Sequence, residues 1–242
     1  MRKVFYAAKF FPDCGSTRDL IRRAEASGCR AIALTVDTPV GGQRERDVRN
    51  GFSYPANLPM SNLLPAGDKY SIPDLAQGGF MGYVNQMFDP SLTWRDLHWI
   101  CSETRLPVLV KGVIRADDAR LATRHGARGI IVSNHGGRQL DTAPATADVL
   151  DSVLQAVGGE ATVLVDGGIR RGTDVLKALA LGARAVLIGR PVLWALAVNG
   201  ESGVKQMLDI LKQEFSIAMA LAGCASIADI DRGLVGRAGV VR

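Results

Sequence analysis

The 242-residue chain has few cysteines, few aromatic residues and no long apolar run. The cysteines lie far apart, without the spacing of metal-binding or redox pairs, so we expect a cytoplasmic protein with no metal site. No apolar run approaches the roughly 18 residues that cross a bilayer, and residues 1–6 are basic but lack the apolar stretch of a secretory signal. We expect the four cysteines to be small buried apolar side chains: Cys14, Cys29, Cys101 and Cys224.

Basic residues are in modest excess, because lysine and arginine outnumber aspartate and glutamate by 29 to 24. They are scattered, form no cluster of five and are not interleaved with aromatic residues, so nucleic-acid binding gets little support. We expect some of the arginines to face an anion at a specific site. The hydrophobic fraction of 47% is sufficient for a substantial core and excludes a disordered chain.

One junction occurs three times along the chain, at Gly28, Gly126 and Gly182. In each copy a helix-like stretch ends at the glycine and a short apolar run follows, which predicts a βα repeat with parallel strands. The preceding helices are expected to begin near 16–17, 117–118 and 173–174, where Ser, Thr or Asp residues can cap them. Their predicted buried faces carry Leu20, Ile21 and Ala24, then Ala119 and Ala122, then Leu176 and Leu179.

Short apolar runs predict six strands, at 4–8, 31–36, 107–110, 129–132, 162–165 and 185–188. The fold class is therefore α/β, and six strands are visible where a closed barrel of the (β/α)8 TIM-barrel type has eight. We expect residues 1–242 to form a single domain. The Pro- and Gly-containing segment 51–89 is expected to be a long active-site loop. A helix over 202–221 is expected to cover the barrel wall with Val204, Leu208, Leu211, Phe215 and Met219.

Polar residues follow the predicted strands at their carboxyl ends, where parallel α/β folds gather their chemistry. His135 follows the fourth strand, and an imidazole there suits proton transfer near neutral pH. Asp37 lies at a neighbouring strand end, where it can orient the ring, and Arg44 and Arg138 can clamp a carboxylate. Spacing alone leaves a structural histidine open as the alternative.

Two glycine-containing segments follow the fifth and sixth strands. Paired glycines let backbone N–H groups approach a phosphate closely, and arginines beside them supply bidentate charge. Barrels often hold a phosphate at the loops after their last two strands. These segments therefore predict a phosphate site, with tight turns and surface arginines as the alternative, at Gly167, Gly168, Arg170, Gly189 and Arg190.

Six short motifs occur in an order that resembles a known family, the FMN-dependent α-hydroxy-acid oxidases and dehydrogenases, which include glycolate oxidase, lactate oxidase and mandelate dehydrogenase. The match runs from about residue 20 to residue 221, and the Ser-Asn-His-Gly-Gly-Arg-Gln-Leu-Asp string at 133–141 is its most specific part. The other motifs are Thr-Val-Asp-Thr-Pro at 35–39, Gly-Gln-Arg-Glu at 42–45, Val-Lys-Gly at 110–112, Asp-Gly-Gly-Ile-Arg at 166–170 and Ile-Gly-Arg-Pro at 188–191.

The resemblance implies a role for each residue at the strand ends. FMN would be the cofactor and an L-2-hydroxy acid the substrate, oxidised to a 2-oxo acid. The general base would be His135, supported by Asp37, with Arg44 and Arg138 on the carboxylate. Lys111 would lie at the flavin edge where negative charge accumulates on reduction. The remaining cofactor-binding residues would be Thr35, Ser133, Asp166, Gly167, Gly168, Arg170, Gly189 and Arg190.

The chain departs from the family pattern at its start, so the resemblance implies a (β/α)8 TIM-barrel that is N-terminally truncated, with about six of the eight strands present. Family members carry a longer N-terminal part with two more strands, and an ungapped register puts Ala7 and Lys9 where they have a flavin-contacting glutamine and a substrate-facing tyrosine. A catalytically silent fragment that cannot hold FMN is therefore the alternative. Another phosphate-binding barrel, like IMP dehydrogenase or isopentenyl-diphosphate isomerase, is a further alternative, and the pair His135 and Arg138 argues against it.

The resemblance leaves several properties open. Family members are often tetramers, which implies a homo-oligomer. The electron acceptor, whether oxygen, a quinone or a protein, is not specified by the residues. Pro55, Leu58, Leu63 and Leu64 make the 51–89 loop apolar, which favours an aromatic or bulky acid such as a mandelate.

Overall fold

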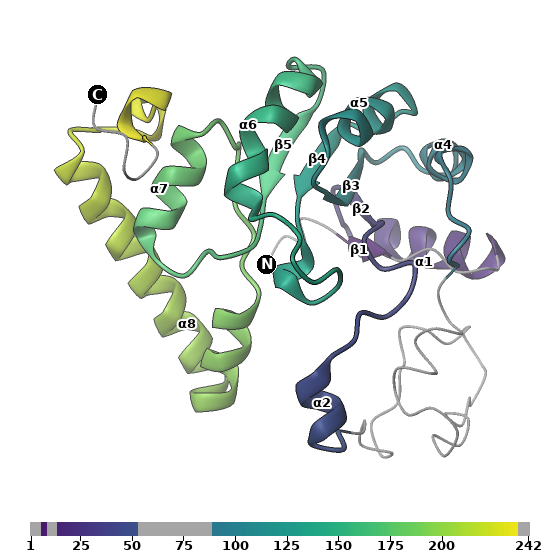
Figure 1. The fold of residues 1–242 in the computed structure, drawn as a ribbon, viewed down its shortest axis with the longest axis horizontal. Coiled ribbons are helices and arrows are strands. Elements are labelled where there is room, and N and C mark those ends of the chain that lie inside the picture. The colour runs from purple at the N-terminus through teal and green to yellow at the C-terminus, as the bar shows by residue number, and fades with distance from the viewer. Residues whose placement is uncertain (1–5, 9–13, 53–88, 237–242) are drawn as a thin grey trace.

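The computed structural model describes residues 6–8, 14–52 and 89–236. One parallel sheet lies at its centre, with its strands in the order β1 (Tyr6–Ala8), β2 (Ile32–Thr35), β3 (Val108–Val113), β4 (Gly129–Val132) and β5 (Thr162–Val165) (Figure 1). The helices are α1 (Cys14–Ala26), α2 (Glu45–Arg49), α4 (Trp94–Glu103), α5 (Ala116–Arg124), α6 (Thr146–Val157), α7 (Gly172–Ala180) and α8 (Arg190–Leu221). The described residues also form short 3-10 helices at η2 (His135–Gly137), η3 (Ile227–Asp229) and η4 (Arg232–Leu234).

The sixth predicted strand is present as a single bridge between Val165 and Val186. Hydrogen bonds on both sides of it join Val165 N to Ala185 O at 3.2 Å and Leu187 N to Val165 O at 2.9 Å. The backbone over 185–187 therefore continues the parallel order of the sheet beyond β5. Five strands and this bridge agree with the predicted partial barrel of βα units.

The three glycine junctions have the geometry that the sequence predicts. Gly28, Gly126 and Gly182 have φ angles of 76°, 102° and 107°, in the left-handed region that favours glycine. In each copy the next residue donates its N–H to a carbonyl five residues earlier, as in the bond of 3.1 Å from Cys29 N to Ala24 O. Each helix thus ends in a tight turn that returns the chain to the sheet.

Alternate residues of the strands form two separate cores. One row packs under the helices, and it includes Ile32, Leu34, Val108, Val110, Ile130, Val132, Val163 and Val165. The other row forms a smaller cluster on the opposite face, with Ala31, Ala33, Leu109, Ile131 and Leu164 buried and Ala185 and Leu187 packed against them. Two residues further along this second row the strands reach Thr35, Lys111, Ser133 and Asp166. The strand period therefore directs these four side chains to one rim of the sheet.

Several strand and helix boundaries differ from the prediction, among them those of β3 and α1. β3 continues to Val113, beyond the predicted end at 110, through an irregularity between Lys111 and Val113 where Gly112 has a φ of 104°. α1 begins at Cys14 rather than at 16–17, so Thr17 is a buried helix residue and not a cap. The predicted buried faces of α1 and α5 are confirmed.

The last two helices pack through small residues rather than through the predicted leucines. Leu176 and Leu179 of α7 are half-buried, whereas Ala178 and Ala180 are buried. α8 begins at Arg190, runs alongside α7 and is interrupted where two residues have non-helical backbone angles (Figure 1). The predicted stripe at 202–221 is half-buried, except for Leu208, which is 46% exposed. The reason is close backbone contact between the two helices, because a Cβ at Gly172 of α7 would overlap the backbone of Phe215 of α8.

All four cysteines are free thiols in the described part of the chain; Cys29 and Cys224 are buried, Cys101 is half-buried and Cys14 is exposed, against the prediction for that residue. No helix within 14–52 or 89–236 is long and apolar enough to cross a membrane. Of the predicted loop 51–89, only Gly51, Phe52 and Asp89 are among the described residues, and its predicted role falls on the part outside them.

Candidate active site

A lysine and a carboxylate meet at the rim where β3, β4 and β5 end. The Nζ atom of Lys111 donates to the Ser133 hydroxyl at 3.1 Å and lies 3.4 Å from Asp166 Oδ2. The Lys111 and Asp166 side chains are only 15% and 16% exposed. Asp166 Oδ1 is buried and has no hydrogen-bond partner among the described residues. The rim thus holds a fixed cation beside an acceptor that is free to take a hydrogen bond.

His135 is bonded to Asp37 across the same rim. His135 Nδ1 lies 2.9 Å from Asp37 Oδ1. Burial raises the pKa of Asp37, but the hydrogen bond with His135 and the charges of His135 and Lys111 outweigh it, so the pKa lies below its usual value. Asp37 is therefore ionised at neutral pH and can only accept, which assigns the hydrogen to His135 Nδ1. The other ring nitrogen, Nε2, is left to exchange a proton with a ligand.

The loop that carries His135 is held in an uncommon backbone conformation. His135 has a φ of 56°, a left-handed angle that costs free energy for a residue with a Cβ. Its N–H donates to the Ser133 hydroxyl at 3.1 Å, and the Asn134 side chain accepts from Gly136 N at 3.1 Å. Arg190 donates to the Gly136 carbonyl at 2.7 Å. These bonds fix the direction of the imidazole before any ligand arrives.

Arg44 and Arg138 lie on segments that are far apart in the sequence but touch in the fold, since a Cβ at Gly42 would overlap the Arg138 carbonyl. Burial lowers the pKa of Arg44, and the positive charge of Arg138 lowers it further. Arg44 Nε is buried without a hydrogen-bond partner among the described residues. Two like charges that repel each other, one of them with an unused donor, favour the binding of an anion between them.

The largest group of predicted site residues lines one cavity of about 430 Å³. At Gly168 and Gly189 an added Cβ would meet no atom within 4 Å, so both backbones border open space. The guanidinium of Arg170 lies 5.6 Å from the Trp194 ring centre, a cation–π contact. The predicted residues that line this cavity are Lys111, His135, Arg138, Asp166, Gly167, Gly168, Arg170, Gly189 and Arg190.

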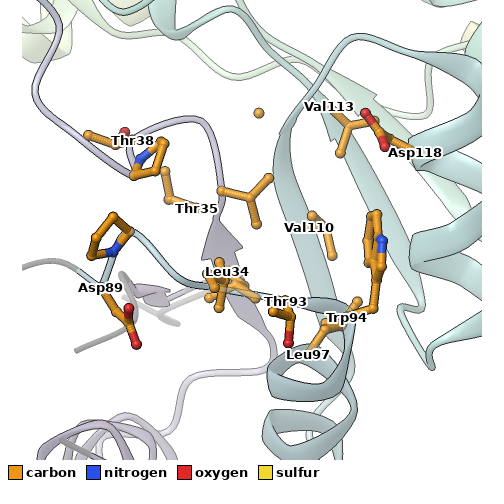
Figure 2. A pocket seen from close by; sticks show the side chains of 15 residues that line it. Leu34, Thr35, Thr38, Asp89, Thr93, Trp94, Leu97, Val110, Val113 and Asp118 are labelled. Carbon is orange, nitrogen blue, oxygen red and sulfur yellow. The ribbon is translucent and has the colours of Figure 1, made fainter. Parts of the chain in front are cut away.

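The other predicted residues lie around this cavity rather than in its lining. Ser133 and Asp37 contact its members directly, and Arg44 is two residues beyond Gly42, which touches the Arg138 backbone. Thr35 pairs in register with Lys111, but it lines a second cavity of about 380 Å³ on the side of α4. Figure 2 shows this second cavity, with Trp94 of α4 across from Thr38. Thr35 is thus the predicted residue that the described structure does not bring to the His135 cavity.

Two residues near the site were not assigned a role from the sequence. Thr146 donates to the Asp166 carbonyl at 2.6 Å, which anchors the end of β5. Gln139 bonds to the backbone beside Asp37. Gln139 is within the motif at 133–141, so that motif was the available signal, whereas nothing in the sequence marks Thr146.

Comparison with known proteins places this geometry in a family. The model of the FMN-dependent dehydrogenase family matches residues 2–237, further in both directions than the 20–221 inferred from motifs. L-lactate oxidase from Nostoc sp. is 53% identical over 90% of this chain and 60% of its own length. Human 2-hydroxyacid oxidase 1 is 50% identical over 93% of this chain and 61% of its own length.

Solved structures give the same result. A crystal structure of mandelate oxidase superposes with a TM-score of 0.82 at 45% identity, over 94% of this chain and 62% of that one. The chain thus spans about 60% of the length of the curated relatives it matches. Because the family model covers nearly the whole chain and the strand-end residues meet at one rim, the chain belongs to the FMN-dependent dehydrogenase family, an α/β fold of the TIM-barrel type whose cofactor is FMN.

Proposed function

We propose that this chain carries the substrate-oxidising site of an FMN-dependent enzyme that converts an L-2-hydroxy acid into a 2-oxo acid. The observation that carries the proposal is the bond of 2.9 Å between His135 and Asp37, in a cavity that Arg138 also lines. Lactate, hydroxy-acid and mandelate oxidases are among its relatives, which supports this class of substrate. A 2-hydroxy acid requires a base that takes a proton and a cation that binds its carboxylate, and His135 and Arg138 supply these two groups.

The residues present fit FMN on three observations. The unused Asp166 Oδ1 would accept from the ribityl chain, and the open backbones at Gly168 and Gly189 leave room for a phosphate. Bound FMN would supply the acceptor for the two electrons that leave the substrate. The residues that would hold it are Lys111, Ser133, Asp166, Gly167, Gly168, Arg170, Gly189 and Arg190; Thr35, which lines the second cavity, is not among them.

His135 performs the proton transfer in this proposal. Its Nδ1–H is held by Asp37, so Nε2 takes the proton from the substrate. The ionised Asp37 then stabilises the resulting imidazolium, because the two charges are opposite and both groups are largely removed from water. Asp37 thus both orients the ring and stabilises its charged form, and it stays ionised throughout.

Arg44 and Arg138 bind the substrate carboxylate, and this fixes which carbon faces the cofactor. A planar guanidinium can donate two parallel hydrogen bonds to a carboxylate, so two of them define its position and its plane. Lys111 keeps a positive charge beside the pocket, where negative charge develops as electrons arrive.

The purified chain tests the proposal by its absorption spectrum. Protein that holds FMN is yellow, and the colour should bleach without oxygen when L-lactate, glycolate or mandelate is added. Mandelate is the acid we favour, because mandelate oxidases are among the similar structures. Bleaching by none of the three acids would contradict the proposal.

A catalytically silent chain is the second candidate. It is favoured by the sheet, which has five strands and one bridge in the described residues where a closed barrel has eight strands. A chain of this kind would remain colourless when FMN is added. Titration of the colourless chain with FMN therefore separates the two candidates.

We also propose a homo-oligomer and a cytoplasmic location for this protein. A homo-oligomer, a tetramer by resemblance, would cover sheet edges that are otherwise open to pairing. The four free thiols support the reducing environment of the cytoplasm. Stopped-flow reoxidation with oxygen and with a quinone would identify the electron acceptor.

A further inference from the structure

Gln139 connects the two segments on which the proposed chemistry depends. Its Nε2 donates to the carbonyls of Asp37 and Val40, both at 3.1 Å, and its Oε1 accepts from Gly42 N at 3.4 Å. All three partners are backbone groups of one short segment, about a hundred residues away in the sequence. One side-chain amide therefore holds the 37–42 segment by both its donor and its acceptor ends.

The contact between these segments is close along the backbone as well. A Cβ at Gly42 would lie 2.7 Å from Gln139 Cα and 2.8 Å from Gln139 O, and it would also overlap the Arg138 carbonyl. Real Cβ atoms do not approach other atoms this closely, so only glycine permits the contact. The hydrogen bonds of Gln139 thus join two segments that already touch. A change in the side-chain amide therefore acts directly on the position of the 37–42 segment.

The segment that Gln139 holds carries two of the site residues. Asp37, whose own carbonyl accepts one of the bonds, bonds to His135, and Arg44 follows Gly42 by two positions. Gln139 is itself next to Arg138 in the sequence. The same clamp therefore fixes the distance between Asp37 and His135 and the approach of Arg44 to Arg138.

We propose that Gln139 is a positioning residue that holds Asp37 against His135 and Arg44 beside Arg138. The proposal rests on the proposed function for its catalytic consequence, whereas the geometric part concerns only contacts within this chain. The chemistry of the amide is specific, because a neutral group that both donates and accepts is required. A carboxylate at this position has no N–H and would face the Asp37 and Val40 carbonyls with a like partial charge.

The test compares Gln139→Met and Gln139→Glu with the parent chain. Gln139→Met keeps an unbranched side chain but removes all three hydrogen bonds, and Gln139→Glu keeps the shape and removes both donors. Gln155→Met is the matched control, since Gln155 bonds only within α6, to Asp151 at 3.3 Å. Circular dichroism establishes that each variant is folded.

The direct readout is the ¹⁵N spectrum of the imidazoles, which needs no cofactor. The chain has three histidines, so comparison with His135→Gln assigns the signal of His135. In the parent, we expect Nδ1 to carry the hydrogen and to be hydrogen-bonded. In both Gln139 variants we expect that signature to weaken, with a mixture of tautomers, and in Gln155→Met to be unchanged. A parent-like His135 signal in both folded Gln139 variants would overturn the proposal.

The kinetic readout applies to FMN-loaded protein. We expect Gln139→Met to lower kcat by up to about 100-fold and to raise KM, because misplacement by about 1 Å has effects of this size. FMN binding should be retained, since the clamp lies beside the substrate carboxylate site. Should the variant instead lose FMN with kcat of the bound fraction unchanged, the assignment to positioning is wrong. If the parent oxidises no hydroxy acid, the proposed function is wrong. The role of Gln139 is still decided by the ¹⁵N comparison.

Discussion

The ammonium group of Lys111 lies 3.4 Å from the carboxylate of Asp166, at the ends of two strands that are not neighbours. β4 lies between them and contributes the Ser133 hydroxyl, which accepts from the same ammonium at 3.1 Å. Three strands therefore converge on one cation. The arrangement of these side chains in the cavity therefore depends on correct pairing of β3, β4 and β5.

Replacing either member of this pair is expected to destabilise the fold. Lys111→Met and Asp166→Asn should each lower the free energy of unfolding by about 2 kcal/mol, between the values for surface and buried pairs. The double variant should lose less than the sum, since neither charge is left alone. Urea denaturation of all four proteins measures the coupling. Additive losses would mean that the two groups do not interact.

His135→Gln is expected to reduce turnover of a hydroxy acid by about 10³-fold or more, because general base catalysis contributes on this scale. Bound flavin should remain, since the imidazole is not among the phosphate-binding residues. Steady-state assays with flavin content measured in the same sample test this. His98→Gln, at an exposed position on α4, is the control and should match the parent.

Arg138→Lys is expected to weaken the binding of acids, because an ammonium point charge cannot replace a planar fork. Oxalate, a stable dicarboxylate, should raise the Tm of the parent and raise that of the variant less. We expect the Kd for oxalate to increase about tenfold, or about 1.4 kcal/mol. Arg115→Lys is the control, as Arg115 is exposed and pairs with Asp117. If oxalate shifts the Tm of the parent and of Arg138→Lys equally, Arg138 does not take part in binding the anion.

Asp37→Asn is expected to change the dependence of stability on pH. The pKa of Asp37 is below its usual value in the folded chain, so its ionised form stabilises the fold. This contribution is complete above the unfolded pKa of about 3.9 and is lost as the pH falls through the lower folded value. The parent should therefore lose stability below about pH 4. The variant should lack that part of the slope when unfolding is measured between pH 2 and 7.

Gly112→Ala is expected to displace Asp37. A Cβ at this position would lie 2.5 Å from Asp37 Cβ and 2.6 Å from its Cγ, in addition to the strain of a φ of 104°. Gly159→Ala is the matched control, because its φ of 83° gives similar strain but no atom lies within 4 Å of the added carbon. The control should lose about 1 kcal/mol and keep its activity. Gly112→Ala should lose more stability and most of its kcat, and equal effects in the two variants would contradict the contact.

The sequence was sufficient to predict much of the site, because strand ends can be located without coordinates. The runs at 129–132 and 162–165 match β4 and β5, so the residues after them could be placed at a common rim. His135 and Asp37 were identified as candidates in this way, whereas the role of Lys111 was implied by the resemblance. Period two then determines which side chains share a face.

The features that the sequence did not predict depend on contacts between distant segments. Gly172 is a position where the backbones of α7 and α8 meet, and no periodic pattern marks such a contact. Leucines on a helix therefore suggested the wrong buried face for α7. Gln139 was quoted only as part of a motif, since its three bonds reach a segment about a hundred residues away.

The division of each strand into two rows has a consequence for how this protein tolerates length changes. Deleting one residue inside β4 would exchange the rows, so that Ser133 would turn toward the helices and Val132 toward the ligand, while the sheet could still pair. A residue added at the turns of Gly28, Gly126 or Gly182 lies outside the strands, so each strand residue keeps its side of the sheet. The placement of the candidate site residues is therefore sensitive to a deletion within a strand and tolerant of insertions at the opposite ends of the strands.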